Sequence, residues 1–170
     1  MIKNKVIVSN GFSKYVLSDA AAELNKYHYL KLLITAIYPS SLQKKIIKLL
    51  SLDKIHSIKR FYQRSADLKD ELVSSLIISD LIFFFGIFTK YKLEKFFKFL
   101  GKFQISGKIL EYSSIQYQRS ASKIFKSNLL NFKDVGVYLF RSGFGGLSLN
   151  IAREMGMKLV CFHAGAHPEL

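Results

Sequence analysis

The stretch that decides the fold reads VGVYLFR (Val135–Arg141), SGFGGLS (Ser142–Ser148), a run with helical spacing (Leu149–Met155) and KLVCF (Lys158–Phe162). An apolar run, a glycine-rich turn, an amphipathic segment and a second apolar run are typical of a β-α-β unit. Polar residues follow both apolar runs, and open α/β sheets bind ligands beyond the carboxyl ends of their strands. The stretch therefore predicts two parallel strands with a ligand site beside them.

A second unit of this kind opens the chain. Lys5–Ser9 predicts a short buried strand, which Asn10-Gly11 ends. Ser18 or Asp19 is placed to cap a helix rich in alanine, and a second apolar run covers Tyr29–Tyr38. This order predicts β-α-β with a right-handed parallel crossover.

The middle of the chain has helical patterns at Leu42–Leu50, Lys69–Phe103 and Glu111–Ser127. Leu76–Phe88 is the most apolar part, and it is too short for a bilayer span of about 20 residues, so we expect a core helix. Together the patterns predict one α/β domain over residues 1–170. Its fold is a Rossmann-like, doubly wound, mainly parallel sheet with a helical insertion at about 42–127.

The charge balance points to an anionic partner. Lys and Arg number 26 against 12 Asp and Glu, a net charge of +14. Nucleic acid, the anionic face of a membrane and phosphorylated substrates all fit this balance. The single cysteine, Cys161, lies in an apolar run, so we expect a buried side chain and no disulfide. With no secretory signal at residues 1–10, a cytoplasmic location is expected.

The first candidate site is the loop Asn10-Gly11-Phe12-Ser13-Lys14. A glycine between a strand and a helix lets backbone N–H groups approach an anionic or sugar ligand, and Lys14 adds a charge for phosphate. Neither the G-x-G-x-x-G nor the Walker pattern is present. A plain turn between strand and helix fits the same residues.

The second candidate site is Arg141-Ser142-Gly143, where a strand is expected to end. The turn begins like a dinucleotide-binding fingerprint, but Ser148 stands where the third glycine should be. A nicotinamide oxidoreductase is therefore disfavoured. A glycine turn whose helix N-terminus faces a ligand remains a prediction.

The third candidate site holds His163 and His167. Two histidines four residues apart can bind a metal, but Gly165 and Pro168 oppose a helix and no carboxylate or cysteine supports them, so we expect no metal. His163 directly follows a strand and fits a general base or a sugar-binding group. A loop histidine bonded to backbone is the alternative.

Lys90–Lys108 combines a basic and an aromatic face. Its leucines and phenylalanines share one helical face, and its lysines lie mostly away from that face. Such a helix can lie on an anionic membrane surface. The alternative, which we favour, is an ordinary surface helix that packs its phenylalanines on the sheet.

Four segments resemble the N-terminal half of GT-B glycosyltransferases: Val8–Lys14, Leu17–Leu24, Tyr138–Gly146 and Cys161–Pro168. They are most similar to retaining family 4, which includes bacterial mannosyl- and glucosyltransferases of surface polysaccharides. The resemblance implies a nucleotide-sugar co-substrate, a saccharide or lipid-linked acceptor, no cofactor and no obligatory metal. It implies a catalytic His163, an acceptor cleft with Arg141, Ser142, Gly143 and His167, and a donor-phosphate loop with Gly11, Ser13 and Lys14.

The resemblance covers only one half of such an enzyme. The C-terminal domain, whose paired glutamates hold the donor, is missing from this sequence. We therefore expect no transfer without that domain or a separate subunit. The implied location is cytoplasmic, at the inner face of the membrane. A basic, non-catalytic nucleic-acid-binding domain is the alternative function.

Overall fold

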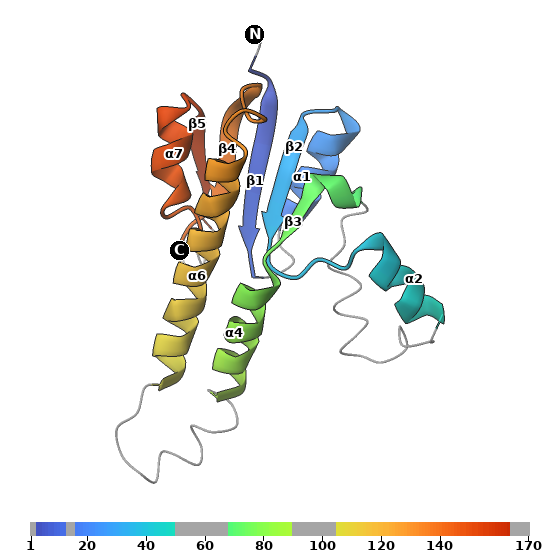
Figure 1. Ribbon diagram of the computed structural model, residues 1–170, viewed down its shortest axis with the longest axis vertical. Coiled ribbons are helices and arrows are strands. Elements are labelled where there is room, and N and C mark those ends of the chain that lie inside the picture. The colour runs from blue at the N-terminus through green and yellow to red at the C-terminus, as the bar shows by residue number, and fades with distance from the viewer. Residues whose placement is uncertain (1–2, 13–15, 50–67, 90–104, 164–170) are drawn as a thin grey trace, which may run out of the picture.

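The computed structural model describes residues 3–12, 16–49, 68–89 and 105–163. These residues form a five-stranded parallel sheet in the order β3-β2-β1-β4-β5 (Figure 1). The strands are β1 (Lys5–Gly11), β2 (Leu30–Thr35), β3 (Val73–Ser75), β4 (Val135–Arg141) and β5 (Lys158–Phe162). The helices are α1 (Val16–Lys26), α2 (Ser41–Leu49), a 3-10 turn η2 (Asp70–Leu72), α4 (Ile77–Phe88), α6 (Ile105–Ser127) and α7 (Ser148–Glu154). The predicted doubly wound α/β fold is confirmed.

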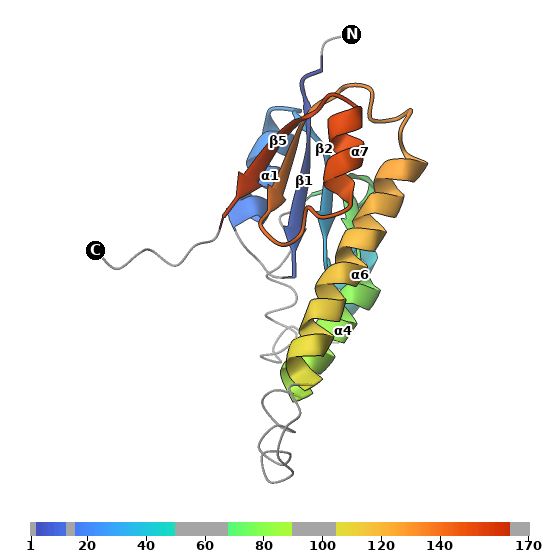
Figure 2. The same cartoon turned by 90° about the vertical axis from the view of Figure 1, so that its left-hand side faces the viewer.

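Helices cover both faces of the sheet, because successive strand residues point to opposite sides. Ile7 lies in a core with α6 and α7, which includes Tyr117 and Ala152. Val8 lies in the other core, with Leu17 of α1. Figure 2 shows α1 on one side of the strands and α6 and α7 on the other.

The structure corrects the predicted helical insertion at about 42–127. Val73–Ser75 forms β3, which pairs in parallel with β2 at the edge of the sheet. The Leu76 N–H then donates to the carbonyls of Thr35 at 2.8 Å and Ala36 at 3.0 Å, and α4 begins directly afterwards. A strand of three residues is too short to show a period, so it was missed.

Two smaller expectations are also wrong. Helix α1 begins at Val16, which places Ser18 and Asp19 inside its first turn, and Ser18 accepts a hydrogen bond from the Asn10 side chain at 2.8 Å. Cys161 is exposed rather than buried. It lies on β5, the edge strand of the described sheet, where only Leu159 and Phe162 are partly covered.

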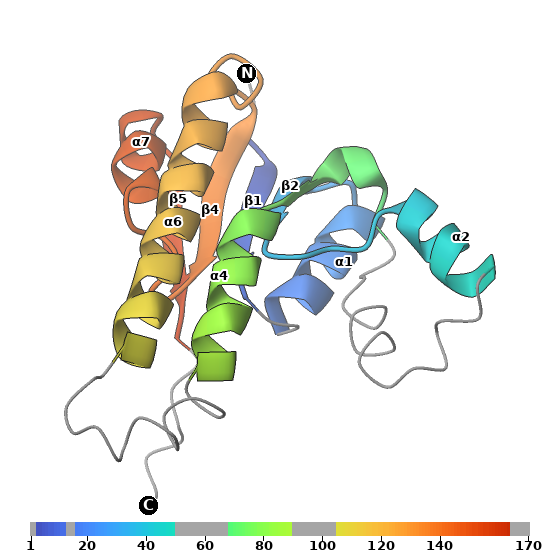
Figure 3. The same ribbon diagram turned by 60° about the horizontal axis from the view of Figure 1, so that its bottom comes forward.

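Helix α4 is not the core helix that its apolar sequence predicts. It lies along the first half of α6, and both extend beyond the carboxyl ends of the strands (Figures 2 and 3). Gly86 allows this close approach, because a Cβ there would lie 2.9 Å from the Leu110 side chain. One side of α4 is thus packed, and the other is exposed. No helix within the described residues is long and apolar enough to cross a bilayer.

Candidate functional site

The topological switch point of the sheet, where successive strands begin to be added on the other side, lies between β1 and β4. From β1 the chain proceeds to β2 and β3 on one side, and it then crosses to β4 and β5 on the other. In open α/β sheets ligands bind beside the carboxyl ends of the strands at this point. Gly11 is the last residue of β1 and Arg141 is the last residue of β4. The first two predicted sites therefore lie together at the carboxyl ends of these two neighbouring strands.

Ser142 and His163 lie side by side beyond β4 and β5. Arg141 is in register with Phe162, and the Ser142 N–H donates to the Phe162 carbonyl at 2.9 Å. The His163 Nδ1 lies 3.1 Å from the Ser142 hydroxyl. This contact orients an exposed imidazole at the sheet edge. The structure thus brings together two residues that the sequence placed in separate motifs.

Arg141 lies over an aromatic ring rather than in open solvent. Its guanidinium carbon is 5.6 Å from the centre of the Phe144 ring, a cation–π distance. Phe144 makes edge contacts with Phe12 at 5.1 Å and with Tyr117 at 5.2 Å between ring centres. Arg141 is therefore a cation held beside an aromatic cluster next to the Ser142–His163 pair.

Gly11 is required by packing and by backbone conformation. Its φ is +82°, and a Cβ would lie 2.8 Å from the Phe144 ring. The Gly11 N–H donates to the Tyr117 hydroxyl at 3.2 Å, and the Gly11 carbonyl accepts from the Ala36 N–H at 3.0 Å. Both backbone groups of Gly11 are thus hydrogen-bonded inside the protein, and the role of this loop toward a ligand stays a prediction.

Gly143 differs from Gly11 in its surroundings. Its φ is +83°, but nothing lies within 4 Å of an added Cβ. Its carbonyl accepts from the Gln118 side chain at 2.9 Å, and that side chain also fills the space beside Gly146. Gln118 of α6 therefore fixes the loop that carries Arg141 and Ser142. The spacing of the motifs carried no signal for this residue.

Tyr117 is the second residue of α6 that sequence reasoning missed. Its buried hydroxyl donates to the Ile34 carbonyl at 2.9 Å and lies 3.0 Å from the Ser9 hydroxyl. Burial raises the pKa of Tyr117 well above its ordinary value. The hydroxyl therefore stays protonated and joins α6 to β1 and β2 as a structural donor.

The glycine turn after β4 is hydrogen-bonded to the start of α7. The Ser148 and Leu149 N–H groups donate to the carbonyls of Gly145 and Gly146, both at 3.1 Å. The Ser148 hydroxyl donates to the Gly145 carbonyl at 2.5 Å and lies 2.8 Å from the Tyr138 hydroxyl. Two N–H groups at the start of α7 are thus bonded within its own loop, and a ligand site at this N-terminus stays a prediction.

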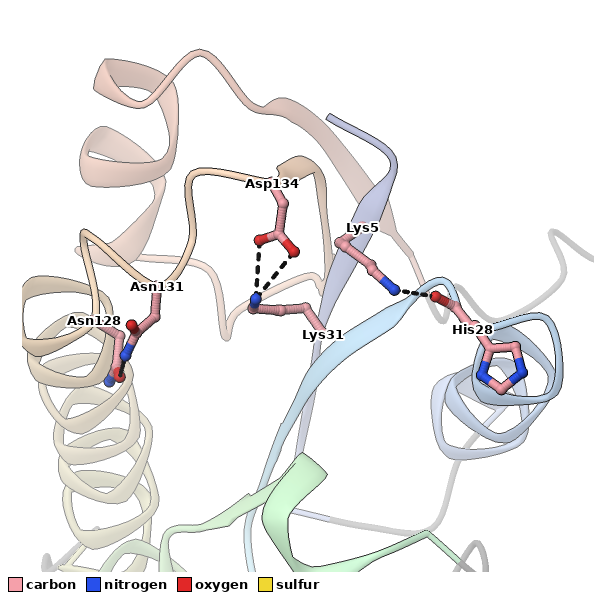
Figure 4. A network of polar contacts seen from close by, with 6 residues as sticks. All are labelled: Lys5, His28, Lys31, Asn128, Asn131 and Asp134. Carbon is pink, nitrogen blue, oxygen red and sulfur yellow. Dashed lines mark hydrogen bonds and ion pairs between the residues drawn. The ribbon is translucent and has the colours of Figure 1, made fainter. Parts of the chain in front are cut away.

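A separate polar network lies at the opposite end of the sheet, where β1, β2 and β4 begin (Figure 4). Lys31 forms an ion pair with Asp134 at 3.0 Å, and Lys5 donates to the His28 carbonyl. These lysines of β1 and β2 hold the loops before β2 and β4. The network at this end is therefore structural.

Several predicted residues lie outside the described part of the chain: Ser13, Lys14, His167 and the Lys90–Gln104 portion of the basic segment. Lys108 is described and is exposed near the start of α6. Within the described ranges, no group of three or more His, Cys, Asp or Glu residues is arranged to hold a metal ion.

No protein family, curated protein or solved structure matches this chain.

Proposed function

We propose that this chain is the acceptor-side domain of a GT-B-type glycosyltransferase, which moves a sugar from a nucleotide sugar to a saccharide or lipid-linked acceptor. The observation that carries the proposal is the Ser142–His163 contact of 3.1 Å at the carboxyl ends of β4 and β5, beside the switch point between β1 and β4, with Arg141 as the last residue of β4. The order of the four sequence segments that resemble such enzymes is further support.

The chemistry of these side chains suits a saccharide. Sugar hydroxyls donate and accept hydrogen bonds, and so do a serine hydroxyl and a neutral imidazole. Arg141 supplies a fixed positive charge, which can stabilise the diphosphate that leaves the transferred sugar. In this proposal His163 contacts the reacting sugar, Ser142 orients its imidazole, and Gly143 keeps the loop open to the acceptor.

In this proposal the nucleotide-sugar donor is bound mainly by groups other than the residues described at the ends of β4 and β5. The Gly11 N–H already contacts Tyr117, so a donor-phosphate role in that loop belongs to Ser13 and Lys14. A C-terminal domain or a separate subunit would hold the rest of the nucleotide sugar. We place the complete enzyme at the cytoplasmic face of a membrane, where lipid-linked acceptors are available.

The test is saccharide binding followed residue by residue. An isotope-labelled chain is titrated with oligosaccharide diphosphates and, separately, with nucleotide sugars, and amide shifts are recorded by NMR. We expect the oligosaccharide shifts to concentrate at Ser142, Gly143 and His163. H163A should keep the Tm of the parent chain, and R141A should lower it by a few degrees at most, because it loses the cation–π contact with Phe144. Both variants should weaken oligosaccharide binding about tenfold or more, equivalent to about 1.4 kcal/mol.

Arg153→Ala is the matched control, because Arg153 is exposed on α7. It should bind oligosaccharide like the parent. Unchanged binding in both R141A and H163A would remove the site assignment. A complete two-domain form should lose transfer in both variants.

The alternative function rests on the net charge of +14. A nucleic-acid-binding domain should bind oligonucleotides with an affinity that falls steeply with salt, because phosphate contacts release counterions. Oligonucleotide binding of that kind, together with no response to oligosaccharide or nucleotide sugar, would replace the glycosyltransferase proposal.

The intact mass of the protein purified from its source tests the domain count. This chain has a mass of 19.5 kDa. A native mass of about twice that value would identify it as one half of a complete enzyme, given the usual size of domains. A native mass equal to this chain would require a partner subunit for transfer.

A further inference from the structure

Helix α4 carries an exposed apolar stripe, formed by Ile77, Ile78, Leu81, Phe84, Phe85 and Phe88. Ile78 is 74% exposed and Leu81 is 58% exposed, although both are aliphatic. At 3.6 residues per turn these six positions fall within an arc of about 120°. Every residue of α4 in that arc is apolar.

The polar residues of α4, and Thr89 directly after it, lie outside this arc and are buried. Ser79 and Asp80 are buried, and so is Thr89, whose hydroxyl donates to the Gly86 carbonyl at 2.7 Å. A helix on a water-facing surface has the reverse arrangement, with polar residues outward. Exposed apolar patches of this extent mark surfaces that bind a membrane or another protein.

The packing of α4 prevents the stripe from turning inward. Phe83 stacks on Phe12 of the loop after β1 with ring centres 4.5 Å apart, and Gly86 lies against the side chains of Ile109 and Leu110. These contacts commit the other side of the helix to the body of the protein. The stripe therefore stays outward on the pair of helices that extends past the sheet (Figures 2 and 3).

Charge decides which partner the stripe fits. The chain carries a net charge of +14, and Lys90–Lys108, which follows α4 almost at once, contains six lysines and one glutamate. Exposed Lys108 directly precedes Ile109 and Leu110, whose side chains lie against Gly86 of α4. Apolar residues together with lysines are the combination that enters the interface of an anionic bilayer, where each cation near the surface adds to binding.

We propose that α4 docks the protein on anionic lipid, with the apolar stripe inserted between the headgroups and the acyl chains. A helix of twelve residues is about 18 Å long, so it lies along the interface and does not cross the bilayer. The inserted surface is α4 itself rather than the basic segment after it. This proposal is independent of the proposed sugar transfer, since it uses none of the residues at the β4–β5 edge.

The test is sedimentation with vesicles of phosphatidylcholine, with and without about one-third phosphatidylglycerol. We expect the parent chain to bind the anionic vesicles and to bind pure phosphatidylcholine at least tenfold less. The combined variant I78Q/L81Q/F85Q should lose at least tenfold in affinity for anionic vesicles. Because these three side chains are exposed, its Tm should not fall.

The matched control replaces three exposed leucines elsewhere, as L49Q/L130Q/L147Q. It removes a similar amount of exposed apolar surface and should bind anionic vesicles like the parent. Equal binding by the α4 variant and the parent would overturn the proposal, and so would no vesicle binding by the parent. A parent that is dimeric without lipid, together with a monomeric α4 variant, would instead assign the stripe to self-association.

Tryptophan fluorescence gives a second readout, because the chain contains no tryptophan. F85W should show a blue-shifted emission on addition of anionic vesicles, and brominated lipid should quench it. L130W is the control and should do neither. Unshifted emission from vesicle-bound F85W would show that another surface contacts the lipid.

Discussion

Gly11 and Gly143 have almost the same backbone conformation but different surroundings. Their φ angles are +82° and +83°, yet only at Gly11 would a Cβ meet a side chain, at 2.8 Å from Phe144. Gly143→Ala should therefore cost only the left-handed backbone penalty, about 1–2 kcal/mol. Gly11→Ala should cost that amount plus about 1–3 kcal/mol for forcing Phe144 aside.

Urea unfolding of the two variants measures this difference in the free energy of unfolding. The pair is its own control, because both substitutions add one methyl group at a positive φ. Equal losses would contradict the contact between Gly11 and Phe144. Gly11→Ala combined with Phe144→Leu should recover part of the added loss, since leucine can move away from the new Cβ.

At the level of elements, α2 begins at a carboxylate from a distant part of the chain. Asp70 accepts from the Ser41 N–H at 3.0 and 3.1 Å and from the Ser41 hydroxyl at 2.7 Å. An acidic side chain at a helix N-terminus binds orphan N–H groups and complements the helix dipole. These hydrogen bonds lower the pKa of Asp70 below its ordinary value of 3.8.

This contact predicts an acid-dependent contribution to stability. Because the pKa is lower in the folded state, the contribution is complete above the unfolded value of 3.8 and is lost as the pH falls through the folded value. The Tm of D70N should therefore lie below that of the parent at neutral pH, and the gap should close below about pH 4. Thermal unfolding between pH 3 and 7 gives the comparison.

Glu71→Gln is the control for that experiment. Glu71 lies 3.9 Å from Lys69, and both side chains are exposed, so this pair adds little. Its Tm gap to the parent should stay near zero at every pH. A D70N gap that persists unchanged at low pH would contradict the role of the carboxylate at the start of α2.

For the whole molecule, the net charge of +14 acts against the folded state. Like charges on a compact protein repel one another, and salt screens this repulsion over about 10 Å at 0.1 M. The Tm should therefore rise by a few degrees between about 20 and 300 mM sodium chloride. Vesicle binding should weaken over the same range, because salt also screens the attraction to anionic lipid. A falling Tm would show that favourable ion pairs outweigh the repulsion.

Much of the fold could be predicted from the sequence, because local patterns specify it. Apolar runs at β1, β2, β4 and β5 indicate parallel strands covered on both faces, and this holds except at β5, the edge strand, which is largely exposed. The two β-α-β units then determine strand direction and crossover. The short strand β3 was missed, since Val73–Ser75 is too brief for a periodic pattern and depends on pairing with Leu33–Thr35.

The candidate site could be predicted only in part. Arg141, Ser142 and His163 follow strand ends, so a parallel sheet must bring them to one edge. The contact that fixes their loop comes from another element: the Gln118 side chain of α6 donates to the Gly143 carbonyl, 25 residues further along the chain. Side-chain packing between distant elements leaves no local signal in the sequence.

The sequence by itself determined the α/β class, the order of most elements and the edge of the sheet where polar side chains gather, because these follow from local periodicity and chain direction. Only the tertiary structure decided which N–H groups of Gly11 and of the first turn of α7 are already bonded and which side of α4 meets solvent. The apolar pattern of α4 predicted burial, but contacts with Phe12 and with Ile109 and Leu110 turned its polar side inward. Burial depends on which residues lie beside a side chain in space, so the sequence of one helix does not determine which of its sides is buried.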